Sequence, residues 1–230
     1  MQEMLKNSIY FGIMISILAY VIGLVIQKTF KLPIFNPLLI SIIIIIAFLL
    51  CFNIDYDSYY ESAKHLSFLL TPATVCLAIP LYEEFELLQK NMKAIMAGLL
   101  SGVMTSLVSI LLLSGFFHLS HSQYVTLLPK SITTAIGIGV SEELGGIVTI
   151  TVTAIIVTGI FGSIISEKVC RLVGIQEPIA KGVAIGSAAH VIGTVKAMEM
   201  GEVEGAMSSL SIGVAGLLTV VGASVFTNFL

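Results

Sequence analysis

The stretch SITTAIGIGVS, residues 131–141, and the stretch GVAIGSAAHVIGTV, residues 182–195, decide how this chain folds. Each is shorter than the roughly 20 apolar residues that one helix needs to cross a bilayer. Each also places glycines and hydroxyl side chains beside an ionisable group, Lys130 at the first and His190 inside the second. In membrane proteins, paired short segments of this kind indicate a substrate site built from broken helices.

The composition places the whole chain in the membrane class. Hydrophobic residues make up 57% of the 230 residues and charged residues only 11%, whereas a soluble domain carries about 25% charged residues. With a net charge of -3 and no basic patch, nothing favours a nucleic-acid partner. Five uncharged windows are long enough to span a bilayer: 8–27, 32–54, 94–117, 144–166 and 205–230.

These features predict an all-α integral membrane protein with one polytopic domain covering residues 1–230. We expect about six to eight membrane segments, including broken or re-entrant helices. The segment 66–82 carries Pro72 and Pro80, so it is expected to be bent or broken. The interval from Thr74 to Glu83 equals the interval from Thr133 to Glu142, which allows inverted repeats, although two matched positions can also arise by chance.

The basic residues predict an orientation. The positive-inside rule puts the three basic clusters on the cytoplasmic side. A full crossing by residues 131–141 would move the third cluster to the outside, so this segment is expected to enter and leave the membrane on one side. The charges leave open whether residues 182–195 cross. The clusters are Lys28 with Lys31, Lys90 with Lys93, and Lys168 with Arg171 and Lys181.

The first candidate site is formed by Lys130, Ser131, Thr133 and Thr134. A lysine at membrane depth costs about 2.5 to 3.5 kcal/mol on insertion scales, so it is expected to line a water-filled path or to meet an anion. Hydroxyls and the backbone N–H groups of a half-helix start would suit a carboxylate. The alternative is that the lysine reaches to the interface and the threonines bond their own backbone.

The second candidate site is formed by His190, Gly193 and Thr194. Histidine changes charge near neutral pH, so His190 could bind substrate or carry a coupled proton. The alternative is a histidine satisfied by a backbone carbonyl. Glu142, Glu199 and Glu202 are candidates for a coupling-ion site if they lie at depth, or solvated charges at helix ends if they lie at the surface.

No other chemistry is indicated. His118 and His121 lack the further ligands that a metal site requires, and the chain has none of the H-E-x-x-H, G-x-S-x-G or P-loop motifs of enzymes. The sequence therefore predicts neither an enzyme nor a cofactor. A homodimer is an open possibility, because the isoleucine-rich run and the small residues Gly98 and Gly102 offer contact surfaces.

Three ordered motifs resemble the LrgB/CidB family over essentially the whole chain. The first is LTPAT at 70–74 with AIPLY at 78–82, in which Thr74 is a further candidate substrate-binding residue. The second is LPKSITT at 128–134, followed by Ser141-Glu142, and the third is His190 with Gly193-Thr194 and the run 197–209. The chain departs from the family pattern at Ala135, where a proline often stands, and at Val191, where a glycine is frequent.

The resemblance implies two functions. Bacterial members are antiholin-like proteins, thought to act with a small holin-like partner of the LrgA/CidA type on murein hydrolase activity and cell lysis. A plant chloroplast relative is a glycolate/glycerate translocator, and bacterial pairs are linked to pyruvate uptake. We therefore expect a multi-pass protein of the bacterial cytoplasmic membrane that transports small monocarboxylates, with H⁺ or Na⁺ coupling possible, and an antiholin-like regulator is the alternative. The sequence does not separate a carrier from a channel.

Overall fold

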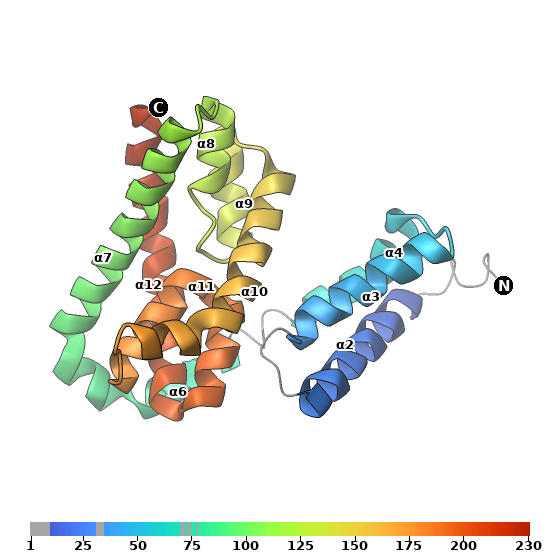
Figure 1. Cartoon of the computed structure of the whole chain (residues 1–230), viewed down its shortest axis with the longest axis horizontal. Helices are drawn as coiled ribbons and strands as arrows, with labels where there is room; N and C mark the ends of the chain where they lie inside the picture. Colours follow the sequence, from blue (N-terminus) through green and yellow to red (C-terminus); the bar gives the residue numbers. More distant parts are fainter. Residues whose placement is uncertain (1–9, 31–34, 70–71, 73–74, 77) are drawn as a thin grey trace. The chain divides into compact units, whose positions relative to one another are not determined.

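The computed structural model describes residues 10–30, 35–69, 72, 75–76 and 78–230. Within these residues the chain is helical and has no β-strand, which confirms the predicted all-α class. The chain divides into two compact units, residues 1–76 and 77–230. Both are drawn in Figure 1. Thr74 and part of the expected broken segment 66–82 lie outside the described residues.

Among its described residues, the first unit has two apolar helices, a short amphipathic helix and a 3-10 helix. A Cβ built on Gly23 of α2 would lie 2.7 Å from the carbonyl oxygen of Pro37, so α2 and α3 approach at backbone distance there. Asn36 Oδ1 accepts from the N–H of Leu38 at 2.9 Å and starts α3. The elements are α2 (Phe11–Phe30), α3 (Pro37–Cys51), α4 (Tyr56–Ala63) and η1 (Lys64–Leu69).

The second unit contains the rest of the chain. Its elements are α6 (Ala78–Glu83), α7 (Phe85–Phe116), α8 (His121–Leu127), α9 (Thr134–Glu143), α10 (Val148–Leu172), α11 (Pro178–Met200), α12 (Glu202–Phe226) and η2 (Thr227–Phe229). Among the described residues, α2, α7, α10, α11 and α12 are long and apolar enough to span a membrane. Helix α3 is shorter than its expected window 32–54. At 1.5 Å per residue its 15 residues reach about 22 Å, which is less than the thickness of a hydrocarbon core.

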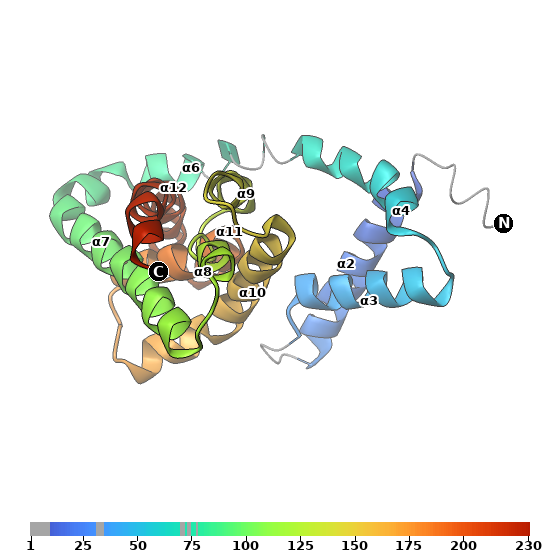
Figure 2. The ribbon, with the colours of Figure 1, turned by 90° about the horizontal axis from the view of Figure 1, so that it is seen from above.

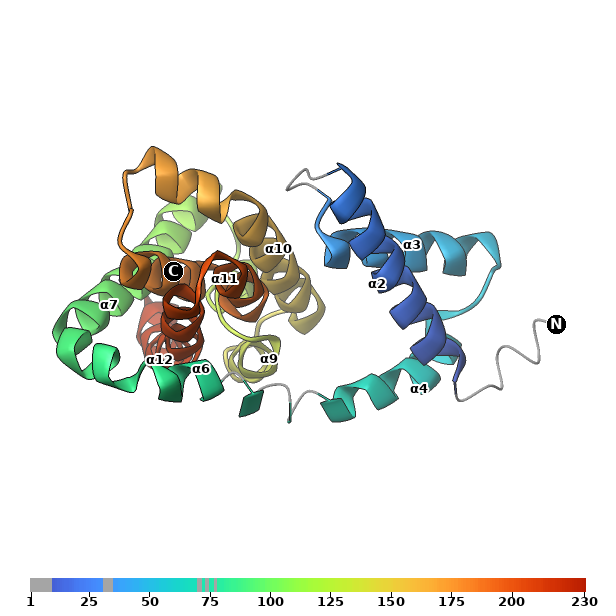
Figure 3. The same ribbon diagram turned by 90° about the horizontal axis from the view of Figure 1, so that it is seen from below.

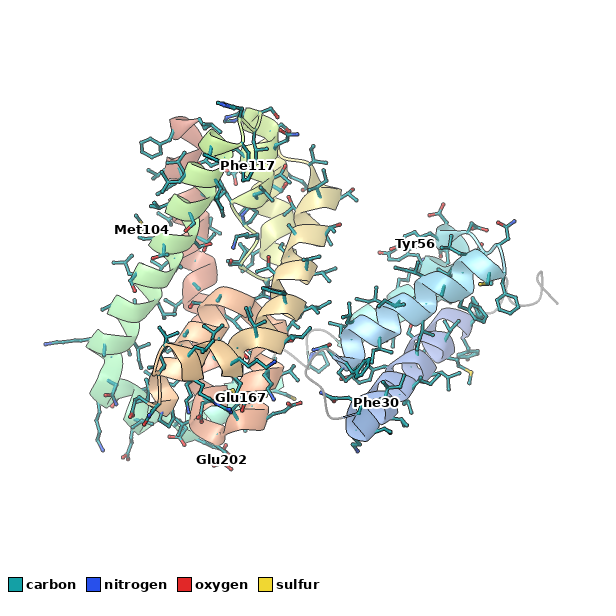
Figure 4. The ribbon with its side chains drawn as sticks, in the orientation of Figure 1. Phe30, Tyr56, Met104, Phe117, Glu167 and Glu202 are labelled. Atoms are coloured by element: carbon teal, nitrogen blue, oxygen red, sulfur yellow. The ribbon has the colours of Figure 1, made fainter. Side chains whose placement is uncertain are left out.

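The two ends of the second unit differ in their content of lysine and arginine. Phe117 follows α7 at one end, and Glu167 and Glu202 lie at the other, as Figure 4 shows. The end with Glu167 and Glu202 also carries Lys168 and Lys181, and we call it the basic end. Helices α7, α10 and α12 each connect the two ends (Figure 1). The basic end corresponds to the side that the positive-inside rule assigns to the cytoplasm.

Helices α8 and α9 form a hairpin, here called the first hairpin (His121–Glu143). The Ser122 hydroxyl at the start of α8 donates to the carbonyl of Gly145, just after α9, at 3.2 Å. The N–H of Ile147 donates to Thr126 Oγ1 at 2.8 Å. Both ends of the hairpin therefore lie together, opposite the basic end. Because α9 has 10 residues, it reaches about 15 Å, half of a hydrocarbon core about 30 Å thick. The hairpin enters and leaves at one end, as expected for residues 131–141, but these residues supply only its tip and one arm, and α8 forms the other arm.

Helix α11 forms a second hairpin (Pro178–Met200), which enters from the basic end. His190 has φ 41° and ψ -139°, and this non-helical residue breaks the helix. Both arms then meet the same residue of α12. A Cβ built on Gly186 in the first arm would lie 2.5 Å from the carbonyl oxygen of Ser208, and Thr194 Oγ1 in the second arm lies 2.8 Å from Ser208 Oγ. In a continuous helix, Gly186 and Thr194 would be about 12 Å apart.

Each hairpin is held in place by its own apolar cluster. The first packs against α7 and α12, and its tip buries Leu128 and Ile132 at 1% exposure each. The second packs on α12 and on the part of α7 near the basic end, where Leu99 of α7 and Met207 of α12 are fully buried. Seen from above, α8 lies between α7 and α10 (Figure 2), and seen from below, α11 lies between the same two helices (Figure 3). Inverted repeats produce an arrangement of this kind, in which two hairpins enter from opposite ends.

Candidate functional site: a polar cavity at the tip of the first hairpin

A cavity of about 1060 Å³ lies among α7, α10, the second hairpin and the tip of the first. At about 30 Å³ per molecule, it has room for roughly 35 waters. It extends from Asn91 and Glu177 near the basic end to Lys130 and Ser131 at the hairpin tip. A space of this size has room for water part of the way through the unit, although most of its lining surface is apolar.

Lys130 is the cation at the inner end of this cavity. Its side chain is half-buried, and Nζ donates to Ser131 Oγ at 3.0 Å. An ammonium group has three N–H donors, so two remain for a ligand in the cavity. No carboxylate forms an ion pair with Lys130 in the part of the chain that the structure describes. This position is consistent with the expectation that Lys130 lines a polar path within the membrane.

Seven hydroxyl-bearing residues contribute to the lining of the cavity, which is otherwise mostly apolar. Ser131 Oγ lies 3.4 Å from Ser106 Oγ of α7, which brings the tip of the first hairpin against that helix. The Thr105 hydroxyl donates to the carbonyl of Ser101 at 2.7 Å, and the Ser187 hydroxyl donates to that of Ala184 at 3.2 Å. The hydroxyl-bearing residues that line the cavity are Ser101, Thr105, Ser106, Ser109, Ser131, Thr158 and Ser187.

The residues on α7 were missed by the sequence analysis, although they left a signal. Ser101, Thr105 and Ser109 recur every four residues, so they form one polar stripe on an otherwise apolar helix. The small residues Gly98 and Gly102, expected to form a contact face, do so within the chain. A Cβ built on either would lie 3.2 to 3.3 Å from Val183 or Ser187 of the second hairpin.

The structure does not bring His190 to this cavity. Its side chain is 3% exposed, and Nε2 lies 3.0 Å from the carbonyl oxygen of Ile155 in α10. A Cβ built on Gly159 would lie 2.7 Å from the imidazole ring, so the ring fills the space that this glycine leaves. Of the two roles considered for His190, the arrangement corresponds to a histidine satisfied by a backbone carbonyl. Gly193 and Thr194 are buried with it, away from the cavity lining.

The remaining predicted site residues also lie outside the cavity. Thr133 and Thr134 begin α9 and are half-buried, but they are not part of the lining. Glu142 is exposed at the end of the first hairpin opposite the basic end. Glu199 and Glu202 are exposed at the basic end, where Glu199 pairs with Lys196 at 3.2 Å and Glu202 lies in the first turn of α12. Of the predicted residues that the structure describes, the cavity therefore unites Lys130 and Ser131.

The basic end carries a network of ion pairs around the second hairpin. Lys181 Nζ lies 3.9 Å from Glu204 of α12, and Lys196 Nζ lies 3.8 Å from Glu167 of α10. Lys181 in the first arm and Lys196 in the second line the same small pocket of about 380 Å³. Both arms of the hairpin thus reach the same end of the unit. Across the described residues, no group of three His, Cys, Asp or Glu side chains could hold a metal ion.

These features define a class: a multi-pass membrane protein with two opposed re-entrant hairpins and a hydroxyl-lined cavity that ends at a lysine. The chain belongs to the LrgB-like family, whose model matches residues 16–229. It is 36% identical over 222 residues to "Antiholin-like protein LrgB" of Bacillus mycoides (strain KBAB4), covering 96% of each chain. The proteins of that name in Bacillus cereus strains B4264 and AH187 are 35% identical over the same length.

No solved structure matches this chain. The expected family is therefore confirmed by sequence relatives alone, and the description of the hairpins and the cavity rests on the present structure. The names of the relatives agree with the antiholin-like alternative, and they say nothing of transport.

Proposed function

We propose that this protein binds small monocarboxylates in the cavity beside Lys130 and moves them across the bacterial cytoplasmic membrane. The observation that carries the proposal is a lysine without a carboxylate partner among the described residues, placed at the end of a cavity that reaches part of the way through the apolar unit. A charge at that depth is costly unless water or an anion compensates it. Glycolate, glycerate and pyruvate are the candidate substrates, and the family resemblance adds support for them.

The chemistry of the lining fits a carboxylate. The two remaining N–H donors of Lys130 can reach the two carboxylate oxygens, and such charge-assisted hydrogen bonds are about twice as strong as neutral ones. The Ser106 and Ser131 hydroxyls, which lie 3.4 Å apart, can each donate to the same anion. A hydroxyl group next to the carboxylate could donate to Thr105 or Ser187, whose own hydroxyls already donate to backbone carbonyls and so present lone pairs.

Uptake of labelled glycolate, glycerate and pyruvate into proteoliposomes tests the proposal. The expected result is saturable uptake in the wild-type protein and at least a tenfold loss in Lys130→Met. Lys93→Met is the matched control, because Lys93 is an exposed lysine outside the cavity lining, and its uptake should equal that of the wild type. Equal uptake by all three proteins, or none by the wild type, would exclude this site as the path.

A second function is favoured by the names of the relatives, which are antiholin-like proteins. In this case the protein regulates murein hydrolase activity and lysis by binding a small holin-like membrane partner. The two functions are compatible, because a partner could respond to a cavity that is empty or filled. A purely structural regulator differs in one respect: its effect does not depend on Lys130.

A lysis assay in cells separates these possibilities. Lys130→Met and Lys93→Met are compared with the wild type for membrane level, co-purification with a holin-like partner and control of lysis. If Lys130→Met keeps its membrane level and its partner but loses control of lysis, regulation operates through the cavity. If Lys130→Met controls lysis as the wild type does, the regulatory function is independent of carboxylate binding.

A further inference from the structure

Ionisable groups are scarce in the cavity. Only Lys130 and Glu177 carry ionisable side chains among the residues that line it. Glu177 is exposed and lies just before α11, at the basic end of the path. The elements that surround Lys130 present hydroxyls and apolar groups: Ser106 and Ser109 from α7, Thr158 from α10 and Ser187 from α11. A group that exchanges a proton with the substrate path at this depth can therefore only be Lys130, among the described side chains.

The other candidates for ion coupling are placed elsewhere. Glu142, Glu199 and Glu202 are exposed at the ends of the unit, and a carboxylate in contact with water on one side only cannot follow a substrate across. His190 is nearly fully buried against the carbonyl of Ile155 and does not line the cavity. The proton-carrying role considered for these four residues has no geometric support, and Lys130 remains.

We propose that Lys130 is both the carboxylate ligand and the proton carrier, so that transport is an electroneutral symport of one proton with one carboxylate. The inference rests on the proposed transport function. While the empty site passes from one side of the membrane to the other, out of contact with the water of the cavity, the side chain is a neutral amine, because an ammonium group there would be an uncompensated charge at depth. On one side of the membrane the amine takes a proton from water and becomes an ammonium group, which then binds the carboxylate.

The loaded site is a neutral pair, and the balance of charge and atoms follows from it. After the cavity opens to the other side, the carboxylate leaves and the ammonium group returns its proton to water there. The neutral amine then moves back empty. One proton and one carboxylate have crossed and no net charge has moved. The only bonds formed and broken are one N–H bond of Lys130 and the O–H bonds of the water that gives up the proton on one side and accepts it on the other. An ammonium group that kept its proton could cross only in its loaded form, because the empty charged state is costly.

The wild-type protein gives the first test. Proteoliposomes are loaded with a pH-sensitive dye, and the membrane potential is set with valinomycin and potassium. The inference expects about one proton per pyruvate, an uptake rate that rises at least tenfold with an inward proton gradient of two pH units, and no change with the potential. Uptake that follows the potential and carries no proton would overturn the inference and leave the proposed transport function intact.

Lys130→Arg gives the second test, because arginine keeps the cation but stays protonated in proteins. This variant is expected to retain exchange of labelled external pyruvate for unlabelled internal pyruvate, since the loaded form can cross in both directions. It should lose at least 90% of net uptake driven by the proton gradient. Net proton-driven uptake equal to that of the wild type would refute the role of Lys130 as proton carrier. If the wild type neither takes up nor exchanges any carboxylate, the proposed function fails, and the inference fails with it.

Discussion

The contact between the second hairpin and α12 gives the sharpest prediction about stability. A Cβ built on Gly186 would lie 2.5 Å from the carbonyl oxygen of Ser208 and 2.7 Å from the Cβ of Ser211. Both obstacles belong to α12, and one of them is backbone, so no flexible side chain can turn away. Gly186→Ala therefore requires α11 and α12 to separate by roughly half an ångström or more, since carbon contacts are optimal at about 3.5 to 4.0 Å.

The size of the effect follows from two opposing terms. Overpacking a well-packed site costs about 1 to 3 kcal/mol, and a radial gap of about 0.5 to 1 Å forfeits a quarter to a half of the dispersion attraction along the interface. Alanine is favoured over glycine in a helix by about 1 kcal/mol, which offsets part of this cost. We expect a net loss of about 1 to 2 kcal/mol, or roughly 2 to 8 °C in Tm at about 2 to 4 °C per kcal/mol.

The assay is the fraction of monodisperse protein on size exclusion after heating in detergent. Gly213→Ala is the matched control: Gly213 lies in α12, is exposed, and nothing lies within 4 Å of a Cβ built there. It gains the helix preference without the clash, so its Tm should equal or exceed that of the wild type. If Gly186→Ala is as stable as Gly213→Ala, the close approach of the two helices is wrong.

Three further predictions concern the hairpins. Thr194→Val removes a fully buried hydroxyl that joins Ser208, and it should cost about 0.6 to 1.7 kcal/mol, seen as a Tm lower by a few degrees; an unchanged Tm would contradict the bond. In a cysteine-free background, Ser122→Cys and Glu142→Cys should react with an impermeant maleimide from the same side of the membrane, because α8 and α9 return to one end; labelling from opposite sides would show a full crossing. Lys196→Gln should change stability by no more than about 1 kcal/mol, because its partners Glu167 and Glu199 are half exposed, and a larger fall in Tm would mean that the ion pairs lock the hairpin.

Several features were predictable from the sequence because they depend on local patterns. The apolar windows that became α7, α10 and α12 are long enough to identify by length alone. A hairpin at residues 131–141 with both ends on one side followed from their length and from the distribution of lysine and arginine, but its other arm, α8, was not predicted. The break inside residues 182–195 was also expected, since polar and small residues interrupt an apolar run around His190.

Side-chain direction at the hairpin tips was not predictable. Lys130 and Thr134 are four residues apart, yet the turn between α8 and α9 separates them, and only Lys130 and Ser131 face the cavity. His190 was paired with Lys130 because both lie in short polar segments, but the space left by Gly159 of α10 takes up its ring. The contribution of α7 was missed because its hydroxyls are spread over nine residues, and their common direction becomes evident only once the helix is placed beside Ser131.

The sequence by itself determined that the chain lies in a membrane, which segments are too short to cross it, and which loops carry the lysine and arginine residues. Hydropathy, length and charge can be read along the chain without knowing how it folds. The tertiary structure alone decided which polar groups share a cavity. That choice depends on how two hairpins from opposite ends pack against α7, α10 and α12. The space left by Gly159 takes up the ring of His190, and the turn between α8 and α9 directs Lys130 to the cavity.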